Sequence, residues 1–471
     1  MKYISTRGGM APLTFSEAVM AGLATDGGLL LPADIPAFSP AELEELATRP
    51  YAAQALEIFS RFVGDDIPAP DLRHLVDKSY AAFSHPAVVP LKKTGSIHIQ
   101  ELFHGPTLAF KDVALQFLGN LFEYLLAQRG DFLNVVGATS GDTGSAAIHG
   151  LRGKDRINIF ILYPRGKVSP VQEMQMTSVL DDNVFNLAIN GNFDDGQRIV
   201  KELFAALDFK EKYHLGAVNS INWARVMAQT VYYFNAWSQL PPAARRDFVV
   251  VVPTGNFGNI FAGWIAGQMG LPIKRLVLAT NANDILYRFI AGGDYRVETV
   301  QPTFSPSMDI QRASNFERYL YYLLDKDSAR LRILMQEFGA SGVLAVDKET
   351  HRRLARDFAS YRVDNQATIA TIRACYQEHH YLIDPHTAAG VAAARAYEAD
   401  YGPVKGLVCL ATAHPAKFPE AVSQAIDQAP AEPPAIAALQ GRPCRFQEIA
   451  ATTAAVRAYI EEKLMESGGM N

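Results

Sequence analysis

A chain of 471 residues is too long for one compact core, so we expect two or three domains. Hydrophobic residues make up 49% of the chain and charged residues 20%, which is an ordinary globular balance. The formal net charge of −5 provides no basic excess to neutralise a phosphate backbone, which argues against nucleic-acid binding.

The cysteines and histidines do not indicate a metal site. Cys375, Cys409 and Cys444 are odd in number and far apart, so they fit neither a disulfide framework nor a zinc site. His379 and His380 are adjacent rather than one helical turn apart. The N-terminus has no apolar core of the signal-peptide type, and no apolar run is long enough to span a membrane. We therefore expect a cytoplasmic protein without a metal or a membrane partner.

Residues 1–95 are expected to form a mostly helical N-terminal cap domain. Thr14 can cap a first helix, and Ser39 followed by Pro40 can begin a second. Two further helical patterns are Tyr51–Phe62 and Asp71–Phe83.

From Ile97 onward the pattern alternates between strand, turn and helix. The later candidate strands are Phe132–Val136, Ile157–Leu162, Val184–Ile189, Phe248–Val252, Arg275–Ala279 and Gly406–Leu410. Their continuous apolar runs indicate strands buried on both faces, as in the parallel sheets of α/β proteins. A long helix over Asn222–Leu240 divides them into two groups. We expect two parallel-sheet lobes with a cleft between them.

The predicted domain limits follow these divisions. The first, smaller α/β lobe is expected over residues 96–240 and the larger α/β lobe over residues 241–427. Residues 428–471 begin with an Ala- and Pro-rich linker and continue as a C-terminal helix.

One stretch, His104-Gly105-Pro106-Thr107-Leu108-Ala109-Phe110-Lys111-Asp112, places a lysine where a helix should begin. The helix dipole and partial burial both lower the pKa of an amine there, which favours its neutral, nucleophilic form. That form is the one that condenses with an aldehyde. Taken alone, Lys111 is more often a solvated lysine on a helix face.

Three loops that follow predicted strands have compatible chemistry. Residues 137–147 combine glycines and hydroxyl side chains at a helix start, a typical anion site, although a plain capped loop would look the same. Residues 253–259 contain two glycines that let backbone N–H groups converge on a phosphate. Thr412, after the last strand, can face a ring or simply cap a helix. Because ligands of open α/β sheets bind at the carboxyl ends of strands, the four stretches together predict a pyridoxal phosphate site.

The lysine stretch resembles the cofactor-lysine motif of the threonine synthase family, in its longer bacterial and fungal form. The similarity covers nearly the whole chain. It extends to Tyr3–Gly8, Thr139–Gly144, Asn219–Arg225, Gly255–Asn259, Ser307–Ile310, Ser314–Arg318, Asp384–Thr387 and Ala411–Pro415. The resemblance implies a fold-type-II pyridoxal phosphate enzyme, similar to the tryptophan synthase β subunit, with a helical N-terminal cap.

The resemblance also implies roles for individual residues. Lys111 would bind the cofactor covalently and act as the catalytic amine. Thr412 would meet the pyridine nitrogen, and a hydroxyl there favours a neutral ring. The cofactor phosphate would be held by Gly255, Asn256, Phe257, Gly258 and Asn259. The substrate carboxylate would be bound by the loop containing Thr139, Ser140, Asp142 and Thr143.

Asp142 departs from the asparagine that many fold-type-II relatives carry, and its charge would repel a carboxylate. We expect it to point toward the cofactor or to cap its helix. For the substrate phosphate, Arg225 is the first choice, with Asn219 and Ser220 beside it. Lys167 is a weaker choice, because a solvated loop lysine is as common.

The implied reaction converts O-phospho-L-homoserine and water into L-threonine and phosphate. Two alternatives stay open: a related pyridoxal phosphate lyase or dehydratase that gives a keto acid, and a non-catalytic threonine-synthase-like binding protein. The expected partner is this small substrate, with no nucleic acid and no membrane. The sequence is compatible with a monomer or a homodimer.

Overall fold

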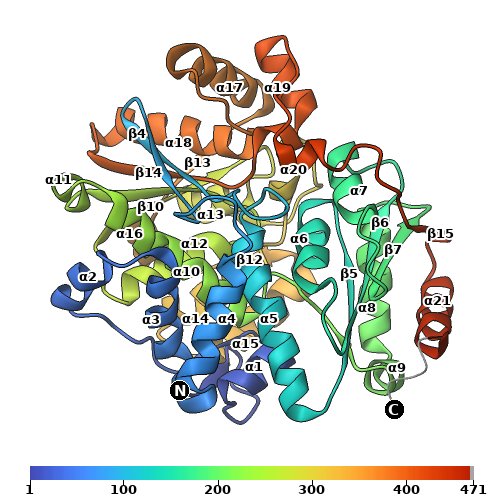
Figure 1. Cartoon of the computed structure of the whole chain (residues 1–471). Helices are drawn as coiled ribbons and strands as arrows, with labels where there is room; N and C mark the ends of the chain where they lie inside the picture. Colours follow the sequence, from blue (N-terminus) through green and yellow to red (C-terminus); the bar gives the residue numbers. More distant parts are fainter. Residues whose placement is uncertain (467–471) are drawn as a thin grey trace.

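The computed structural model describes residues 1–466 and contains two main sheets with helices around them (Figure 1). Residues 467–471, including the Gly468-Gly469 end of the expected C-terminal segment, lie outside the described residues. Within residues 1–466, no helix is both long enough and apolar enough to cross a membrane. The same residues contain no group of three or more His, Cys, Asp or Glu side chains that could hold a metal ion.

The larger sheet has six strands in the order β13-β10-β9-β14-β4-β3. Their bounds are β3 Leu91–Thr94, β4 Ile97–Glu101, β9 Phe248–Pro253, β10 Ile273–Thr280, β13 Phe358–Arg362 and β14 Gly406–Ala411. All neighbouring pairs are parallel except β3 with β4, which form an antiparallel hairpin.

Burial of this sheet on both faces follows from its continuous apolar sequences. In β9, Val250 and Val252 belong to the main hydrophobic core, which includes residues of the helices α10 (Trp223–Gln239) and α12 (Gly258–Gln268). Val249 and Val251 point the other way, into a second core that helix α18 (Pro385–Tyr401) covers. Successive side chains therefore serve opposite faces.

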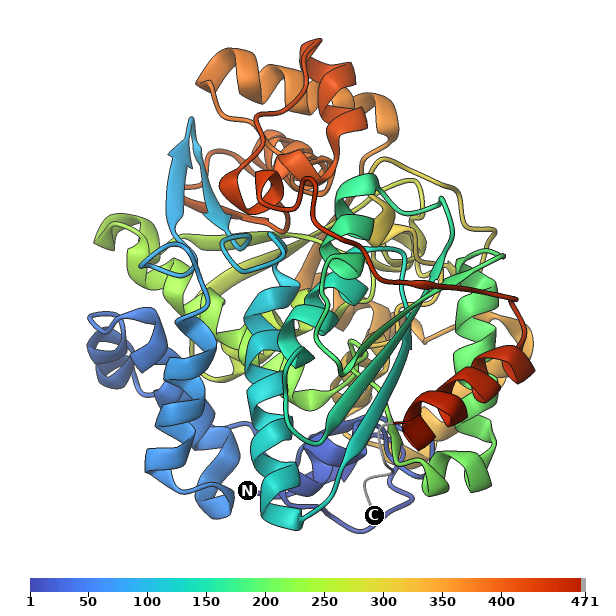
Figure 2. The ribbon, with the colours of Figure 1, turned by 45° about the vertical axis from the view of Figure 1, so that its right-hand side comes forward.

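The smaller sheet has five parallel strands in the order β15-β7-β6-β5-β8. Their bounds are β5 Leu133–Ala138, β6 Ile157–Pro164, β7 Val184–Ile189, β8 Leu215–Gly216 and β15 Gln447–Ile449. Helices α8 (Phe193–Ala205) and α21 (Thr453–Glu466) pack together against one face of this sheet (Figure 2).

The N-terminal cap is helical, as expected. Thr14 and Ser39 both make capping boxes, each accepting the N–H of a glutamate three residues on, whose carboxylate accepts the N–H of the cap in return. The cap contains β1 Tyr3–Ser5, β2 Leu30–Pro32, α1 Phe15–Ala21, α2 Pro40–Leu46, α3 Tyr51–Val63 and α4 Ala69–Tyr80. The strands β1 and β2 form an antiparallel pair.

The remaining helices connect the strands. Between the sheets and on their outer faces lie α5 Lys111–Arg129, α6 Asp142–Leu151, α7 Pro170–Thr177, α9 Leu207–Lys212, α11 Pro242–Arg245, α13 Ile285–Gly292, α14 Phe316–Leu323, α15 Ser328–Ser341, α16 Lys348–Asp357, α17 Asn365–His379, α19 Pro419–Ile426 and α20 Pro434–Ala437. A short antiparallel pair joins β11 Tyr295–Arg296 to β12 Val343–Leu344. Three short 3₁₀ turns are η1 Gly64–Asp66, η2 Pro306–Met308 and η3 Pro415–Lys417.

The sheets do not divide at the predicted residue limits. The strand β3 begins inside the predicted 1–95 cap, and β4 lies inside the predicted 96–240 lobe, yet both belong to the larger sheet through the pairing of β4 with β14. Likewise β15, from the predicted 428–471 segment, adds to the smaller sheet beside β7. The chain thus crosses between the lobes more often than strand order along the sequence indicates, while the domain limits themselves stay a prediction.

Seven strands were not predicted at all: β2, β3, β8, β11, β12, β13 and β15. The strand β13 starts directly after α16, with no turn residue between Asp357 and Phe358 to mark the change. The strands β8 and β15 have only two and three residues. In each case pairing with a neighbour, rather than local pattern, decides the strand.

Hydrogen bonds of Arg318 connect the N-terminal cap to the larger lobe. It is fully buried, and its guanidinium donates to the Leu30 carbonyl oxygen (Nη2–O 2.8 Å), the Ile221 carbonyl oxygen (2.5 Å) and Asn315 Oδ1 (2.6 Å). We expect Arg318→Met to leave these buried acceptors without donors and to lower the free energy of unfolding by about 3 kcal/mol. Urea unfolding followed by circular dichroism measures this loss.

Arg312 provides the matched control. It is exposed and lies over the Phe338 ring at 5.1 Å. Arg312→Met should cost no more than about 1 kcal/mol. Equal losses of unfolding free energy in the two variants would contradict the proposed role of Arg318 as a buried connection between the cap and the larger lobe.

Candidate active site

The predicted lysine stands at the carboxyl ends of neighbouring strands. In the larger sheet β9, β14 and β4 are adjacent, and residues 254–257, Thr412 and the loop before Lys111 follow their respective ends. The N–H of Phe110 donates to the Thr412 carbonyl oxygen at 2.8 Å, which joins two of these loops directly before Lys111. The parallel arrangement therefore brings together segments that are about 140 to 300 residues apart in the sequence.

Lys111 is the first residue of α5, and its side chain is only 8% exposed. Its Nζ lies 3.4 Å from Ser307 Oγ and 3.6 Å from Asp142 Oδ2. Burial lowers the pKa of the Lys111 amine; the Asp142 carboxylate opposes this effect, and the charges of Lys417 and Arg225 add to it. These surroundings shift the Lys111 amine toward the neutral form that condenses with an aldehyde.

Asp112 shapes the turn that presents Lys111. Its two carboxylate oxygens accept from the Thr107 N–H (2.8 Å) and the Thr107 hydroxyl (2.7 Å). A Cβ atom on Gly105 would lie 2.4 Å from Asp112 Cβ, so only glycine fits there. Burial raises the pKa of Asp112 to about 6.

Asp142 points toward Lys111, the residue that is predicted to bind the cofactor. The carboxylate is 5% exposed, and its Oδ1 lies 2.7 Å from Lys417 Nζ and accepts from Gln172 Nε2 at 2.9 Å. Its Oδ2 accepts from Ser307 Oγ at 3.2 Å. Burial would raise the pKa of Asp142, but the charges of Lys417 and Lys111 outweigh burial and hold it well below its usual range.

Thr139 acts on its own loop. Its Oγ1 accepts the backbone N–H groups of Gly141 (3.0 Å) and Gly144 (2.8 Å), which holds the start of α6 in shape. The hydroxyls of Ser140 and Thr143 are half-buried at the same helix start. The loop therefore retains two side-chain hydroxyls and the free N–H groups of a helix N-terminus for an anion.

The glycine loop is closely packed. A Cβ atom on Gly255 would lie 2.9 Å from the Ser307 carbonyl oxygen, and Phe257 adopts the left-handed region (φ +64°) immediately before α12. The Asn256 carbonyl oxygen accepts from the Asn315 N–H at 3.1 Å. The buried Nδ2 of Asn259 has no hydrogen-bond partner within the described residues.

Arg225 and Lys167 are placed very differently. Arg225 is 2% exposed in the first turn of α10, where Nη1 donates to the Val218 carbonyl oxygen (3.1 Å) and Nε has no partner among the described residues. No carboxylate in residues 1–466 forms an ion pair with it, and burial lowers its pKa to about 10. Lys167 is exposed in the loop after β6.

Ser220 and Asn219 precede α10. Ser220 Oγ lies 3.3 Å from Ser314 Oγ and accepts from Asn315 Nδ2 at 3.4 Å, which places it beside the glycine loop. Asn219 is exposed, and its side chain accepts the Ile221 N–H.

Sequence reasoning missed roles for Lys417, Ser307 and His386. Ser307 and His386 lie in stretches that carried the resemblance, whereas Lys417 lies just beyond the stretch Ala411–Pro415. His386 Nδ1 lies 2.7 Å from Asp384 Oδ2, and its Nε2 accepts the Ser307 N–H at 3.2 Å. Ser307 in turn contacts both Lys111 and Asp142. The short motifs could have indicated Ser307 and His386 as candidate site residues, but not which residues each of them contacts.

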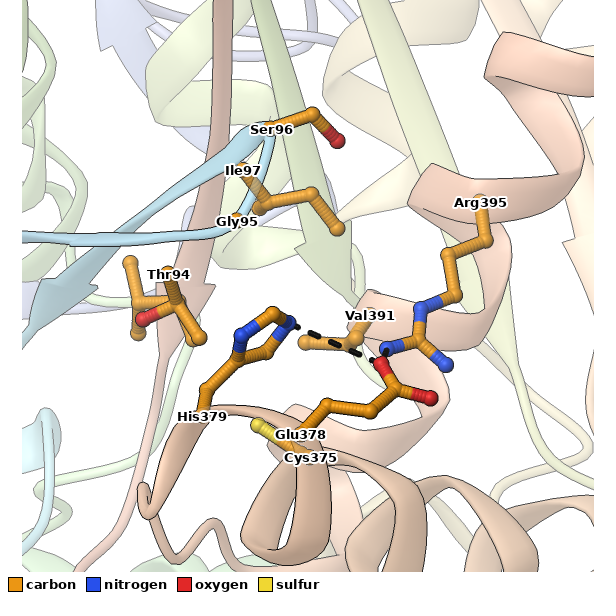
Figure 3. Close-up of a pocket in the computed structure, with 10 residues that line it drawn as sticks. Thr94, Gly95, Ser96, Ile97, Cys375, Glu378, His379, Val391 and Arg395 are labelled. Atoms are coloured by element: carbon orange, nitrogen blue, oxygen red, sulfur yellow. Dashed lines mark hydrogen bonds and ion pairs between the residues drawn. The ribbon is translucent and has the colours of Figure 1, made fainter.

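Two cavities lie away from this centre. One of about 330 Å³ is bounded by the turn before β4 and by α17 and α18, where Arg395 and His379 both turn toward Glu378 (Figure 3). Because it adjoins the amino end of β4, it is at the opposite edge of the sheet from Lys111. A second cavity of about 220 Å³ lies beside Trp264 and Asp357.

Comparison with known proteins supports the resemblance along the whole chain. Family models described as threonine synthase N terminus, pyridoxal-phosphate dependent enzyme, and threonine synthase, C-terminal match residues 2–80, 86–413 and 387–460. The chain belongs to the threonine synthase family. Threonine synthase of Pseudomonas aeruginosa is 47% identical over 464 residues, covering 98% of both chains.

Solved structures of threonine synthases have the same fold. The pyridoxal-phosphate-bound enzyme of Brucella melitensis matches with a TM-score of 0.95 at 46% identity, covering 98% of this chain and 99% of that one. The yeast enzyme matches with a TM-score of 0.94 at 42% identity, covering 99% of each. The fold-type-II class, the dependence on pyridoxal phosphate and the enzymatic nature of the family agree with the sequence analysis.

The residues present fit pyridoxal phosphate. A buried amine with a lowered pKa suits the aldehyde, and the start of α12, with its unpartnered Asn259 Nδ2, suits the phosphate. The position of Thr412 beside the backbone of Phe110 suits contact with the ring. Pyridoxal phosphate is the cofactor of this family, and the assignment of these residues to it is a prediction.

We expect Lys111→Ala to abolish the visible absorption of the lysine-bound cofactor, because it removes the amine that is predicted to attach the cofactor. Absorbance spectra of the purified protein with added pyridoxal phosphate measure this. Lys274→Ala, at an exposed site paired with Asp247, should retain the absorption. Survival of the visible band in Lys111→Ala would show that another residue holds the cofactor.

Proposed function

We propose that this protein converts O-phospho-L-homoserine and water into L-threonine and inorganic phosphate. The observation that carries the proposal is that an amine, Lys111, and a guanidinium, Arg225, are both buried, and that residues 1–466 provide no carboxylate partner for Arg225. An amine beside a vacant cationic group suits a substrate that is both an amino acid and a phosphate ester.

The cofactor supplies an electron sink for negative charge next to the substrate amino group. Lys111 Nζ then serves as the base that removes the α-proton and passes protons between the carbon atoms of the substrate. Cβ also loses a proton, and the Cγ–O bond to phosphate breaks. Cγ and Cα each gain a proton, a water oxygen bonds to Cβ, and the proton that this water loses goes to the released phosphate. A lowered pKa makes it easier for one amine both to accept and to return protons.

Arg225 is proposed to bind the substrate phosphate. Its charge is buried at the N-terminus of α10, where the helix dipole also disfavours an unneutralised cation, so an anion there stabilises both. Ser220 and Asn219 would add a hydroxyl and an amide. Lys167 is a weaker candidate for binding the substrate phosphate, because it is exposed.

The substrate carboxylate is proposed to bind at the start of α6. Ser140, Thr143 and backbone N–H groups are the donors, and Thr139 holds the loop. Asp142 does not oppose this role, because its charge is already neutralised by Lys417. The carboxylate of Asp142 is also buried, and it accepts hydrogen bonds from Gln172 and Ser307.

The remaining expectations are proposals as well. A cytoplasmic location agrees with the three free cysteines of the described residues, and the net charge of −5 agrees with a protein that binds a small molecule rather than nucleic acid. We propose that it acts without a membrane partner, as a monomer or a homodimer.

We expect purified protein with pyridoxal phosphate to release phosphate and threonine from O-phospho-L-homoserine in equal amounts. Phosphate is followed by a coupled colour assay and threonine by chromatography. Formation of a keto acid and ammonia instead would favour the lyase or dehydratase alternative. A protein that binds the substrate without releasing phosphate would favour the non-catalytic alternative.

We expect Arg225→Met to raise the KM for O-phospho-L-homoserine by about tenfold or more, because a buried charge-assisted contact to phosphate is lost. Lys167→Met should raise it by less than about threefold, as for an exposed charge. Steady-state kinetics on both variants, with circular dichroism to confirm folding, compare the two cations. The reverse ranking would assign the phosphate to Lys167.

A further inference from the structure

A second lysine, Lys417, lies in the reaction centre without a role in the proposed chemistry. It is fully buried in the turn η3, and its Nζ lies 2.7 Å from Asp142 Oδ1 and donates to the Thr107 carbonyl oxygen at 2.8 Å. Buried lysines are rare, and each needs a partner that offsets the cost of removing its charge from water. Asp142 is that partner.

Asp142 is shared unequally between the two lysines. Its distance to Lys417 Nζ is 2.7 Å, whereas its distance to Lys111 Nζ is 3.6 Å. Since a carboxylate in close contact with Lys111 would hold that amine in its charged form, the longer distance matters for chemistry. The closer cation therefore determines how strongly Asp142 acts on Lys111.

We propose that Lys417 is a positioning residue, which binds the Asp142 carboxylate and thereby keeps the Lys111 amine out of a close ion pair. This inference rests on the proposed role of Lys111. If it holds, the turn η3 after β14 influences the reactivity of Lys111 at the start of α5. Lys417 also fixes Thr107, whose hydroxyl and N–H hold Asp112 in the turn before Lys111.

The groups around Lys111 agree with the unequal sharing of Asp142 between the two lysines. Facing it are Asp142 on α6, Lys417 on η3 and Arg225 on α10, with the neutral hydroxyl of Ser307 on η2. His386 on α18 lies behind Ser307. Asp142 is the one carboxylate among these groups, so removal of Lys417 would leave Lys111 as its nearest cation.

The test measures the pKa of Lys111 in the full-length chain without cofactor. Competitive acetylation between about pH 6 and pH 11, followed by mass spectrometry, reports the pH at which the amine becomes reactive. In Lys417→Met this midpoint should rise by about one unit, because Asp142 would pair with Lys111. The double variant Asp142→Asn/Lys417→Met should restore a low midpoint.

The control is Lys154→Met, which removes a largely buried lysine that pairs with Glu123 far from the centre. Its midpoint for Lys111 should equal that of the wild type. An unchanged midpoint in Lys417→Met, or an equal rise in the double variant, would overturn the proposal. If Lys417→Met does not fold, two other variants test the inference. Lys417→Arg should keep the wild-type midpoint of Lys111, and Asp142→Asn should lower that midpoint. Any other pair of results refutes the inference.

A second readout uses the holoenzyme. The acidic limb of the pH profile of kcat should move to higher pH in Lys417→Met and return in Lys417→Arg, whereas a purely structural lysine would change kcat without moving the limb. The labelling result does not involve substrate. Failure of the proposed reaction and failure of this inference therefore appear in separate measurements.

Discussion

Two buried lysines share one buried carboxylate, and the reaction centre depends on that imbalance of charge. Asp142 lies 2.7 Å from Lys417 and 3.6 Å from Lys111, and Arg225 adds a further cation, for which residues 1–466 provide no carboxylate partner. Burial lowers the pKa of the Lys111 amine, and the positive charges of Lys417 and Arg225 lower it further. The same positive charges attract an anionic ligand. Reactivity and substrate charge are thus matched by the same arrangement.

The fold creates this arrangement by joining loops from two sheets. Lys111 and Lys417 follow β4 and β14 of the larger sheet, whereas Asp142 begins a helix after β5 of the smaller sheet. Ser307 connects them and is itself held by His386 and Asp384. The centre is therefore an interface between the lobes, so a change in their relative position would alter the distance between the amine and its carboxylate.

The cap and the crossings of the chain connect the two lobes. Arg318 binds the backbone of β2 and of the loop before α10, and Glu317 accepts from both Thr6 and Arg7 of the N-terminal strand region. The strand β15 returns from the C-terminal segment to the smaller sheet. These contacts tie segments around Ser220 and Arg225 to the glycine loop, where the phosphate groups of cofactor and substrate are proposed to bind.

The sequence by itself determined the elements with strong local signals. The capping residues Thr14 and Ser39, the apolar strands such as β9 and the long helix α10 lie where their patterns predicted, because caps and continuous apolar runs are decided by near neighbours. The motif around Lys111 likewise indicated the cofactor and the family. Only the tertiary structure decided that β4 joins the larger sheet, that Asp142 faces two lysines and that Lys417 is one of them. Those facts depend on contacts between residues on different strands and helices, and no local periodicity records which buried charge will meet which partner.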